Sequence, residues 1–285
     1  MDSIRRFAHP ELRRPKALIA FEGWSDACDA ASGAAAYLLG QLDAEEPFAV
    51  IDPEEFFDFK DRRPIVEVDD GGTRSLSWPT TRFYGIHQPE ADHDLMVVLG
   101  EEPNLRWRTF ARLVAQLLDE SGVEQAVTLG AFAGQVAHTI PVPVIGVATD
   151  PDLVARLGLL TSRYEGPTAI LSVVLEACRE TGIQAVSLWA ATPHYLAANA
   201  NPKAMLALLR EAERVVDLAF DTHELETAAD EFGERVTEAM GTSSDLADYV
   251  KRLEESAWDG EFLDRGEEAG DQLIEDIEQY LRNQG

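Results

Sequence analysis

Cysteine is scarce in this sequence of 285 residues. The spacing of its two cysteines fits neither a metal site nor a redox pair. Cys28 and Cys178 stand far apart, and each lies in an apolar, helix-like pattern. A zinc site or a redox pair needs a second nearby cysteine or clustered histidines. We therefore expect two reduced, structural thiols and no metal site.

Long hydrophobic runs are also missing. The longest, such as residues 17–21, 95–99 and 185–191, are much shorter than the ~18 residues that a membrane-spanning helix needs. The arginines before residue 17 precede too short an apolar run for a signal peptide. These absences predict a cytoplasmic protein without a membrane partner.

Positively charged residues are also few. The chain has 24 Lys and Arg against 52 Asp and Glu, a net charge of −28. Proteins that bind nucleic acids need a basic surface for the phosphates, so we expect no nucleic-acid partner. Residues 221–285 hold 20 acidic and 5 basic side chains, which gives −15 and leaves −13 for the first 220 residues. This shift predicts an α/β domain over residues 1–220 and an acidic helical extension over residues 221–285.

The motifs of familiar enzymes are absent as well. The sequence contains no GxSxG, no HExxH, no GxxxxGK[ST] and no complete GxGxxG fingerprint. We therefore assign no catalytic residue, expect no cofactor, and leave open whether the protein is an enzyme.

What the sequence does contain is an alternation of short apolar runs and longer amphipathic stretches, which predicts an α/β fold with a mostly parallel sheet. Strands are expected at 17–21, 95–99, 126–129, 142–147 and 185–191, and helices up to 42 and at 105–121, 150–157, 168–181 and 202–218. Four short β runs between 48 and 87, with a hairpin turn at 70–72, predict an antiparallel insertion at a sheet edge. Three helices are expected after residue 220, at 222–239, 244–256 and 270–282.

Chemically useful side chains follow several of these strands. Ligands of open parallel α/β sheets usually bind beyond the carboxyl ends of the strands. The candidate binding residues there are Glu22, Trp24, Asp26, Glu101, Asn104, Arg106, Glu165 and His194. In a binding site, Arg106 would hold an anionic group, a carboxylate would take an amine or act as an acid or base, and His194 would titrate near neutral pH.

A structural interpretation of the same residues stays open. The acids would suit helix N-termini, where Asp26 or Ser25 caps the first helix, and Arg106 would sit in a salt-bridge cluster. His194 and His138 would then be packing or hydrogen-bonding residues.

An ordered series of short motifs gives a further prediction. The motifs are FEGWSDA (21–27), DPEEFFDF (52–59), RRP (62–64), GEEPNLRW (100–107), TLGA (128–131), YEGPTAI (164–170), WAATPHY (189–195) and NPKA (201–204). Their order and spacing resemble the bacterial, actinobacterial-type branch of the PAC2 (proteasome assembly chaperone 2-like) family over about residues 15–220. The resemblance implies a three-layer α/β/α sandwich similar to the phosphorylase/hydrolase-like fold, and self-association or pairing with a related chain.

The resemblance also implies a function. Eukaryotic and archaeal relatives assist proteasome assembly, and some dock through a C-terminal hydrophobic-Tyr-X ending, whereas Tyr280 is not penultimate here. Our leading hypothesis is a non-enzymatic protein-interaction or assembly-chaperone-like module that forms a homo-oligomer and has a proteasome-related partner. The alternative is an enzyme or sensor that binds a small-molecule ligand at the strand ends.

Overall fold

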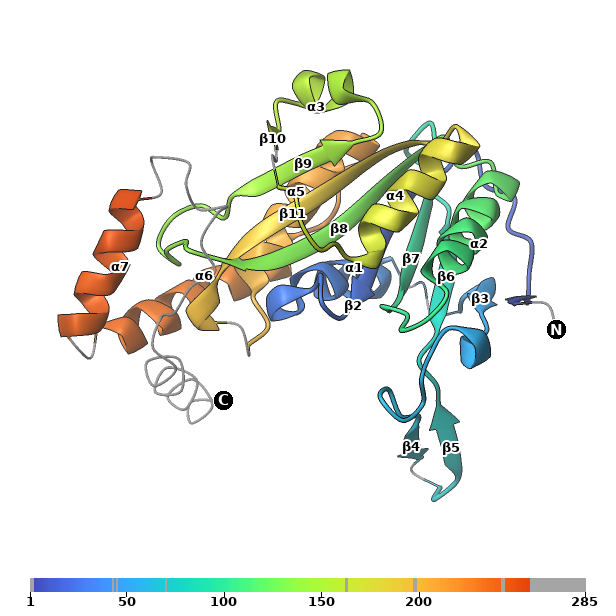
Figure 1. Ribbon diagram of the computed structural model, residues 1–285, viewed down its shortest axis with the longest axis horizontal. Helices are drawn as coiled ribbons and strands as arrows, with labels where there is room; N and C mark the ends of the chain where they lie inside the picture. Colours follow the sequence, from blue (N-terminus) through green and yellow to red (C-terminus); the bar gives the residue numbers. More distant parts are fainter. Residues whose placement is uncertain are drawn as a thin grey trace.

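A mixed β-sheet forms the middle of the protein (Figure 1). The computed structural model describes residues 3–42, 44, 46–69, 71–161, 164–196, 199–241 and 244–256. Within these ranges the main sheet has nine strands in the order β1-β3-β6-β7-β2-β8-β11-β9-β10. The strands are β1 (Ile4–Arg6), β2 (Lys16–Glu22), β3 (Ala49–Ile51), β6 (Thr81–Ile86), β7 (Leu95–Glu101), β8 (Gln125–Gly134), β9 (Val144–Ala148), β10 (Leu160–Thr161) and β11 (Gln184–Pro193).

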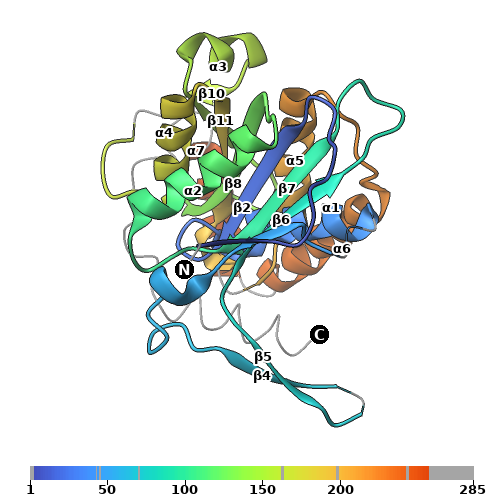
Figure 2. The ribbon, with the colours of Figure 1, turned by 90° about the vertical axis from the view of Figure 1, so that its right-hand side faces the viewer.

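Helices cover both faces of this sheet (Figure 2). They are α1 (Ala30–Gln41), α2 (Trp107–Glu120), α3 (Pro151–Leu157), α4 (Ile170–Thr181), α5 (Pro202–Val216), α6 (His223–Met240) and α7 (Ser244–Ser256), with short 3₁₀ turns η1 (Ala27–Asp29), η2 (Pro53–Glu55) and η3 (His194–Leu196). In the described part of the chain, no helix is both long and apolar enough to cross a membrane.

The central strand β2 shows why the fold has three layers. Residues 17–21 are fully buried, as expected for a parallel strand covered on both faces. Because side chains alternate along a strand, Leu18 and Ala20 join the apolar cluster under α1 and α5. Ala17, Ile19 and Phe21 join the cluster under α2 and α4. The predicted α/β architecture is therefore confirmed.

Strand β9 runs in the opposite direction to the central strands of the sheet. The strands β7, β2, β8 and β11 run parallel, whereas β9 pairs antiparallel with β11. A parallel return needs a crossover of a dozen or more residues, usually a helix. Residues 135–143 form a shorter connection with two prolines and no helix, so the chain comes back in the opposite direction.

The segment between residues 48 and 87 divides into two parts. Strands β3 and β6 extend the main sheet with antiparallel pairing. Strands β4 (Ile65–Val68) and β5 (Arg74–Ser77) form a separate two-stranded sheet. Figures 1 and 2 show this hairpin projecting away from the body of the molecule.

The last described helices close one end of the sheet. Phe232 and Val236 of α6 and Val250 of α7 form an apolar cluster with Tyr195 of η3. Leu225 of α6 also joins the cluster under α1 and α5. The change in composition at residue 220 therefore does not coincide with a break in the packing. The helices expected at 222–239 and 244–256 correspond to α6 and α7, while the one expected at 270–282 lies outside the described residues.

Candidate functional site

Two acidic side chains lie side by side where β2 and β7 end. Glu22 and Glu101 are register partners in the parallel pair. Arg62 lies between them, with its Nη2 3.4 Å from Glu22 Oε2 and its Nε in contact with Glu101. Burial raises the pKa of Glu22, Glu101 raises it further, and Arg62 opposes the change. One guanidinium thus pairs with two carboxylates, and the cluster keeps a net charge of −1 when both acids are ionised.

The turn after β2 is fastened to its neighbours by Glu102. Gly23 has a φ of +126°, and a Cβ there would lie 2.9 Å from the Cβ of Glu102. The Glu102 carboxylate accepts hydrogen bonds from the backbone N–H groups of Trp24 (3.2 Å) and Ile170 (2.8 Å), the first residue of α4. Its role is thus to hold two turns together, while the Trp24 side chain is 64% exposed.

Asp26, just before the 3₁₀ turn η1, binds the first turn of helix α1. Its Oδ1 accepts hydrogen bonds from the backbone N–H groups of Ala31 (2.7 Å) and Ser32 (3.1 Å), and its Oδ2 accepts one from the Ser32 hydroxyl (2.5 Å). Burial raises the pKa of Asp26, and the hydrogen bonds from Ser32 and Ala31 oppose that rise. The carboxylate therefore satisfies N–H groups that the first turn of a helix leaves open.

Asn104 and Arg106 anchor the acidic, aromatic segment that follows β3. Asn104 accepts a hydrogen bond from the backbone N–H of Asp58 (3.1 Å) and donates one to Asp61 (2.8 Å). The Nη1 of Arg106 lies 2.8 Å from Oε1 of Glu55, and both side chains are about half exposed. The guanidinium that was predicted to hold an anionic ligand thus holds a carboxylate of its own chain.

A second group of polar residues lies where β8 and β11 end. The Nδ1 of His194 lies 3.2 Å from the carbonyl oxygen of Gly134, and its Nε2 lies 2.9 Å from the hydroxyl of Tyr249 on α7. Burial lowers the pKa of His194. This histidine therefore connects the end of the sheet to the last described helix.

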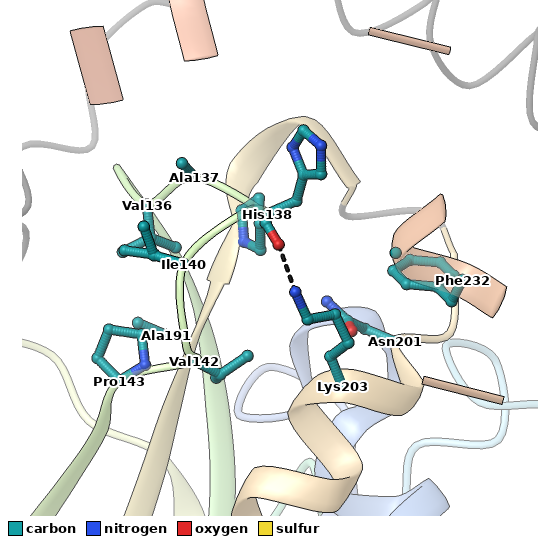
Figure 3. A pocket seen from close by; sticks show the side chains of 12 residues that line it. Val136, Ala137, His138, Ile140, Val142, Pro143, Ala191, Asn201, Lys203 and Phe232 are labelled. Atoms are coloured by element: carbon teal, nitrogen blue, oxygen red, sulfur yellow. Dashed lines mark hydrogen bonds between the residues drawn. The ribbon is translucent and has the colours of Figure 1, made fainter. Parts of the chain in front are cut away.

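His138 makes a similar connection to α6. Its backbone N–H donates to the Tyr195 hydroxyl (2.9 Å), which also lies 2.8 Å from its Nδ1, and its Nε2 is 3.3 Å from the hydroxyl of Thr237. The Lys203 amine donates a 2.5 Å hydrogen bond to the His138 carbonyl oxygen (Figure 3). Burial, followed by the nearby Lys203 charge, lowers the pKa of His138 to about 4.

Two hollows of the described surface lie away from the predicted residues. The cavity of Figure 3, between residues 136–143 and helices α5 and α6, has a volume of about 10 Å³, the size of one water molecule. An open groove of about 480 Å³ lies between residues 141–144, residues 158–160 and the same two helices. None of the eight candidate residues lines either hollow. Nor do the described residues include a group of His, Cys, Asp and Glu suited to a metal ion.

The structure thus brings together only part of the predicted set. Glu22 and Glu101 meet through Arg62, and Asn104 and Arg106 share the segment after β3. Glu165 is exposed, and no hydrogen bond or ion pair within the described ranges joins it to the other candidates. Sequence reasoning missed the structural roles of Arg62, Glu102, Tyr195 and Lys203. All four stand inside the short motifs, which was the available signal.

Comparison with known proteins places the chain in a family. The model of the PAC2 family matches residues 20–240. The chain belongs to the PAC2 family. This PAC2 protein is 44% identical to a PAC2 family protein from Streptomyces avermitilis, with a TM-score of 0.77 over 83% of this chain and 99% of that one. It is 41% identical to a proteasome-assembly chaperone homologue from Mycobacterium tuberculosis, with a TM-score of 0.76 over 82% of this chain and 99% of that one.

More distant structures share the fold of this PAC2 protein. An archaeal proteasome activator from Pyrococcus furiosus is 20% identical, with a TM-score of 0.61 over 82% of this chain and 97% of that one. A search of curated proteins finds no match. The resemblance seen in the sequence motifs is therefore confirmed at the level of the family.

Proposed function

We propose that this PAC2 protein is a non-enzymatic protein-interaction module that assists proteasome assembly. The main support for the proposal is that side chains at the strand ends are paired or buried within the chain. This is the edge where open α/β sheets usually bind ligands. At one half of that edge Arg62 pairs with Glu22 and Glu101, and at the other half Tyr195 lies under α6 and α7 with no exposed surface. The relative from M. tuberculosis, a proteasome-assembly chaperone homologue, supports the same function.

The alternative of a small-molecule enzyme or sensor is not favoured. The carboxylate of Asp26 and the guanidinium of Arg106 are both bonded within the chain. The cavity of Figure 3 and the open groove beside it both lie away from the candidate residues. A role of these residues in binding a ligand or a partner stays a prediction.

Three finer assignments belong to the proposal. The protein acts in the cytoplasm, since the sequence lacks long apolar runs. Its architecture corresponds to the phosphorylase/hydrolase-like fold. The acidic extension proposed for the segment after residue 220 rests on its charge of −15 and, among the described residues, on helices α6 and α7.

The proposal is tested with the purified full chain and purified proteasome α- and β-type subunits from the same cell. We expect a defined complex with a subunit or an assembly intermediate, and faster formation of the core particle on native gels. An unrelated acidic protein of similar net charge is the control, because charge alone promotes non-specific association. If neither a complex nor faster assembly is seen, the proposed function is wrong.

A further inference from the structure

The open groove of about 480 Å³ beside helix α5 has the size of a ligand pocket, for which ~300–1,000 Å³ is usual. Its walls are residues 141–144, residues 158–160 and part of α6. Most of the lining residues are Val, Leu, Ala or Pro, and none is aromatic. The residues that α5 contributes lie three or four positions apart on one helix face, and they are Lys203, Leu206, Ala207, Arg210 and Glu211.

The wall opposite α5 is held in shape by close packing. Strand β9 lies between β11 and β10 in the main sheet, so hydrogen bonds fix it on both sides. A Cβ at Gly146 would lie 2.6 Å from Cδ1 of Leu159, which shows that the glycine lets this leucine lie directly against β9. The apolar surface of the groove is therefore formed in the unbound chain.

Lys203 is a half-buried cation in this groove without an ion-pair partner. It lines both the groove and the cavity of Figure 3, which share Val142 and Lys203. Its amine donates to the carbonyl oxygen of His138, and in the described part of the chain no carboxylate lies within ion-pair distance of it. Asp230 attracts it only from farther away, and burial lowers the pKa of the amine. An ammonium has three donors, so two of them are left for a further acceptor.

The other charges along α5 are already paired. Arg210 lies 3.1 Å from Glu226 of α6, and Glu211 lies 2.6 Å from Arg214, one turn along the same helix. Buried charges are normally paired, because taking them out of water is costly. In a chain with a net charge of −28, anions are not attracted non-specifically. Lys203 is thus the group in the groove that selects the charge of a ligand.

We propose that the groove binds an aliphatic carboxylate of medium length, with the carboxylate on the Lys203 amine and the hydrocarbon chain along the apolar walls. From Lys203 to Arg210 the α5 face extends seven residues, ~10.5 Å, which an extended octanoate chain matches. A peptide fits less well, because its amides need hydrogen-bond partners that the aliphatic lining does not offer. The site is separate from the strand ends, and no reaction is proposed there. It goes beyond the proposed function, and the test uses the purified chain alone.

The test compares octanoate with octanol in ligand-observed NMR titrations of the full chain, up to about 3 mM ligand. Both probes have the same chain, but only octanoate can pair with an ammonium. We expect octanoate to bind at least roughly tenfold more tightly than octanol. Acetyl-trileucine, which carries a carboxylate on a peptide, should bind more weakly than octanoate. No binding of octanoate, equal binding of octanol, or tighter binding of the peptide would each overturn the proposal.

Two substitutions separate the charge from the apolar walls. Lys203→Gln should weaken octanoate at least roughly tenfold and leave octanol unchanged, whereas Lys251→Gln, exposed on α7, should behave as the parent chain. Ala207→Phe fills the groove and should abolish binding of both probes, with Ala36→Phe on the exposed side of α1 as its control. Normal octanoate binding by either groove variant would contradict the assigned site.

A further measurement needs no variant and so does not depend on how a variant folds. The chain contains four lysines, Lys16, Lys60, Lys203 and Lys251, which peptide mapping by mass spectrometry distinguishes after labelling with acetic anhydride. Octanoate should slow the labelling of Lys203 and leave that of the exposed Lys251 unchanged. Labelling of Lys203 at the same rate with and without octanoate would show that the carboxylate does not bind its amine.

Discussion

The two halves of the strand-end edge are held together by different interactions, exposed ion pairs in one and buried hydrogen bonds in the other. At β2 and β7, Glu22, Arg62 and Glu101 form ion pairs, two of whose members are about half exposed. At β8 and β11, His138 and Tyr195 hydrogen bond beneath α6 and are buried. Exposed ion pairs contribute little to stability, whereas a buried polar group that loses its partner is costly. The difference predicts that the second half controls the stability of this end of the molecule.

The largest expected effect comes from emptying the cluster beneath the helices. Phe232 of α6 is 5% exposed and packs in the cluster around Tyr195. Phe232→Ala should lower the free energy of unfolding by about 3–5 kcal/mol, through lost burial and a residual cavity. Urea denaturation measures this. Glu231→Ala, one position away and exposed, is the control and should stay within about 0.5 kcal/mol. If both substitutions lowered the free energy of unfolding by similar amounts, the buried half would not control the stability of this end of the molecule.

The next effect is a dependence of stability on pH. The pKa of His138 falls from 6.5 to about 4 on folding, so the unfolded chain binds more protons between these values. Its contribution, roughly 3 kcal/mol at most, is therefore present above pH 6.5 and is lost as the pH falls toward 4. Urea denaturation at about pH 7.5, 5.5 and 4.5 should show a smaller loss in His138→Gln than in the parent chain. Identical losses would exclude His138 as the responsible group.

A smaller change isolates one hydroxyl group. Tyr195→Phe removes the acceptor of the His138 N–H and leaves that group buried without a partner. We expect a loss of about 1–3 kcal/mol in the free energy of unfolding. Tyr249→Phe is the matched comparison, because its hydroxyl bonds His194 at a partly buried position that water reaches more easily. The Tyr249 variant should lose less, and the opposite order would show that burial does not set the cost.

The smallest effect is expected in the charged half. Arg62→Gln should cost about 0–1 kcal/mol, because exposed ion pairs are screened by water and salt. Thermal denaturation at low and high salt should show that the difference from the parent chain shrinks as salt is added. Arg106→Gln, which breaks the half-exposed pair with Glu55, should behave alike. A loss of more than about 2 kcal/mol in either variant would mean that these ion pairs contribute more to the free energy of unfolding than exposed pairs usually do.

Local patterns predicted most of the regular structure. The apolar run at 17–21 became the buried strand β2, and Pro202 was correctly predicted to begin α5. The strand β1 was missed, because three residues carry too little periodicity to be recognised. The direction of β9 was not predicted, because it depends on the length of the connection and on the available neighbour.

The sequence placed candidate residues at strand ends but did not predict which of them contact one another. Glu22 and Glu101 were both expected at the carboxyl ends of strands, and the structure makes them register partners there. The contacts of His194 with Tyr249 and of His138 with Lys203 join residues 55 and 65 positions apart. No local pattern encodes such pairs.

Local sequence was enough to specify the alternation of strands and helices, the motifs of the PAC2 family and the concentration of negative charge after residue 220. Each of these is a property of neighbouring residues or of composition. Long-range packing set the rest: Arg62 pairs with both acids, α6 and α7 cover Tyr195, and strands β4 and β5 form a sheet of their own. These outcomes depend on which distant surfaces bury one another, and that is set by the packing of the whole chain rather than by any single segment.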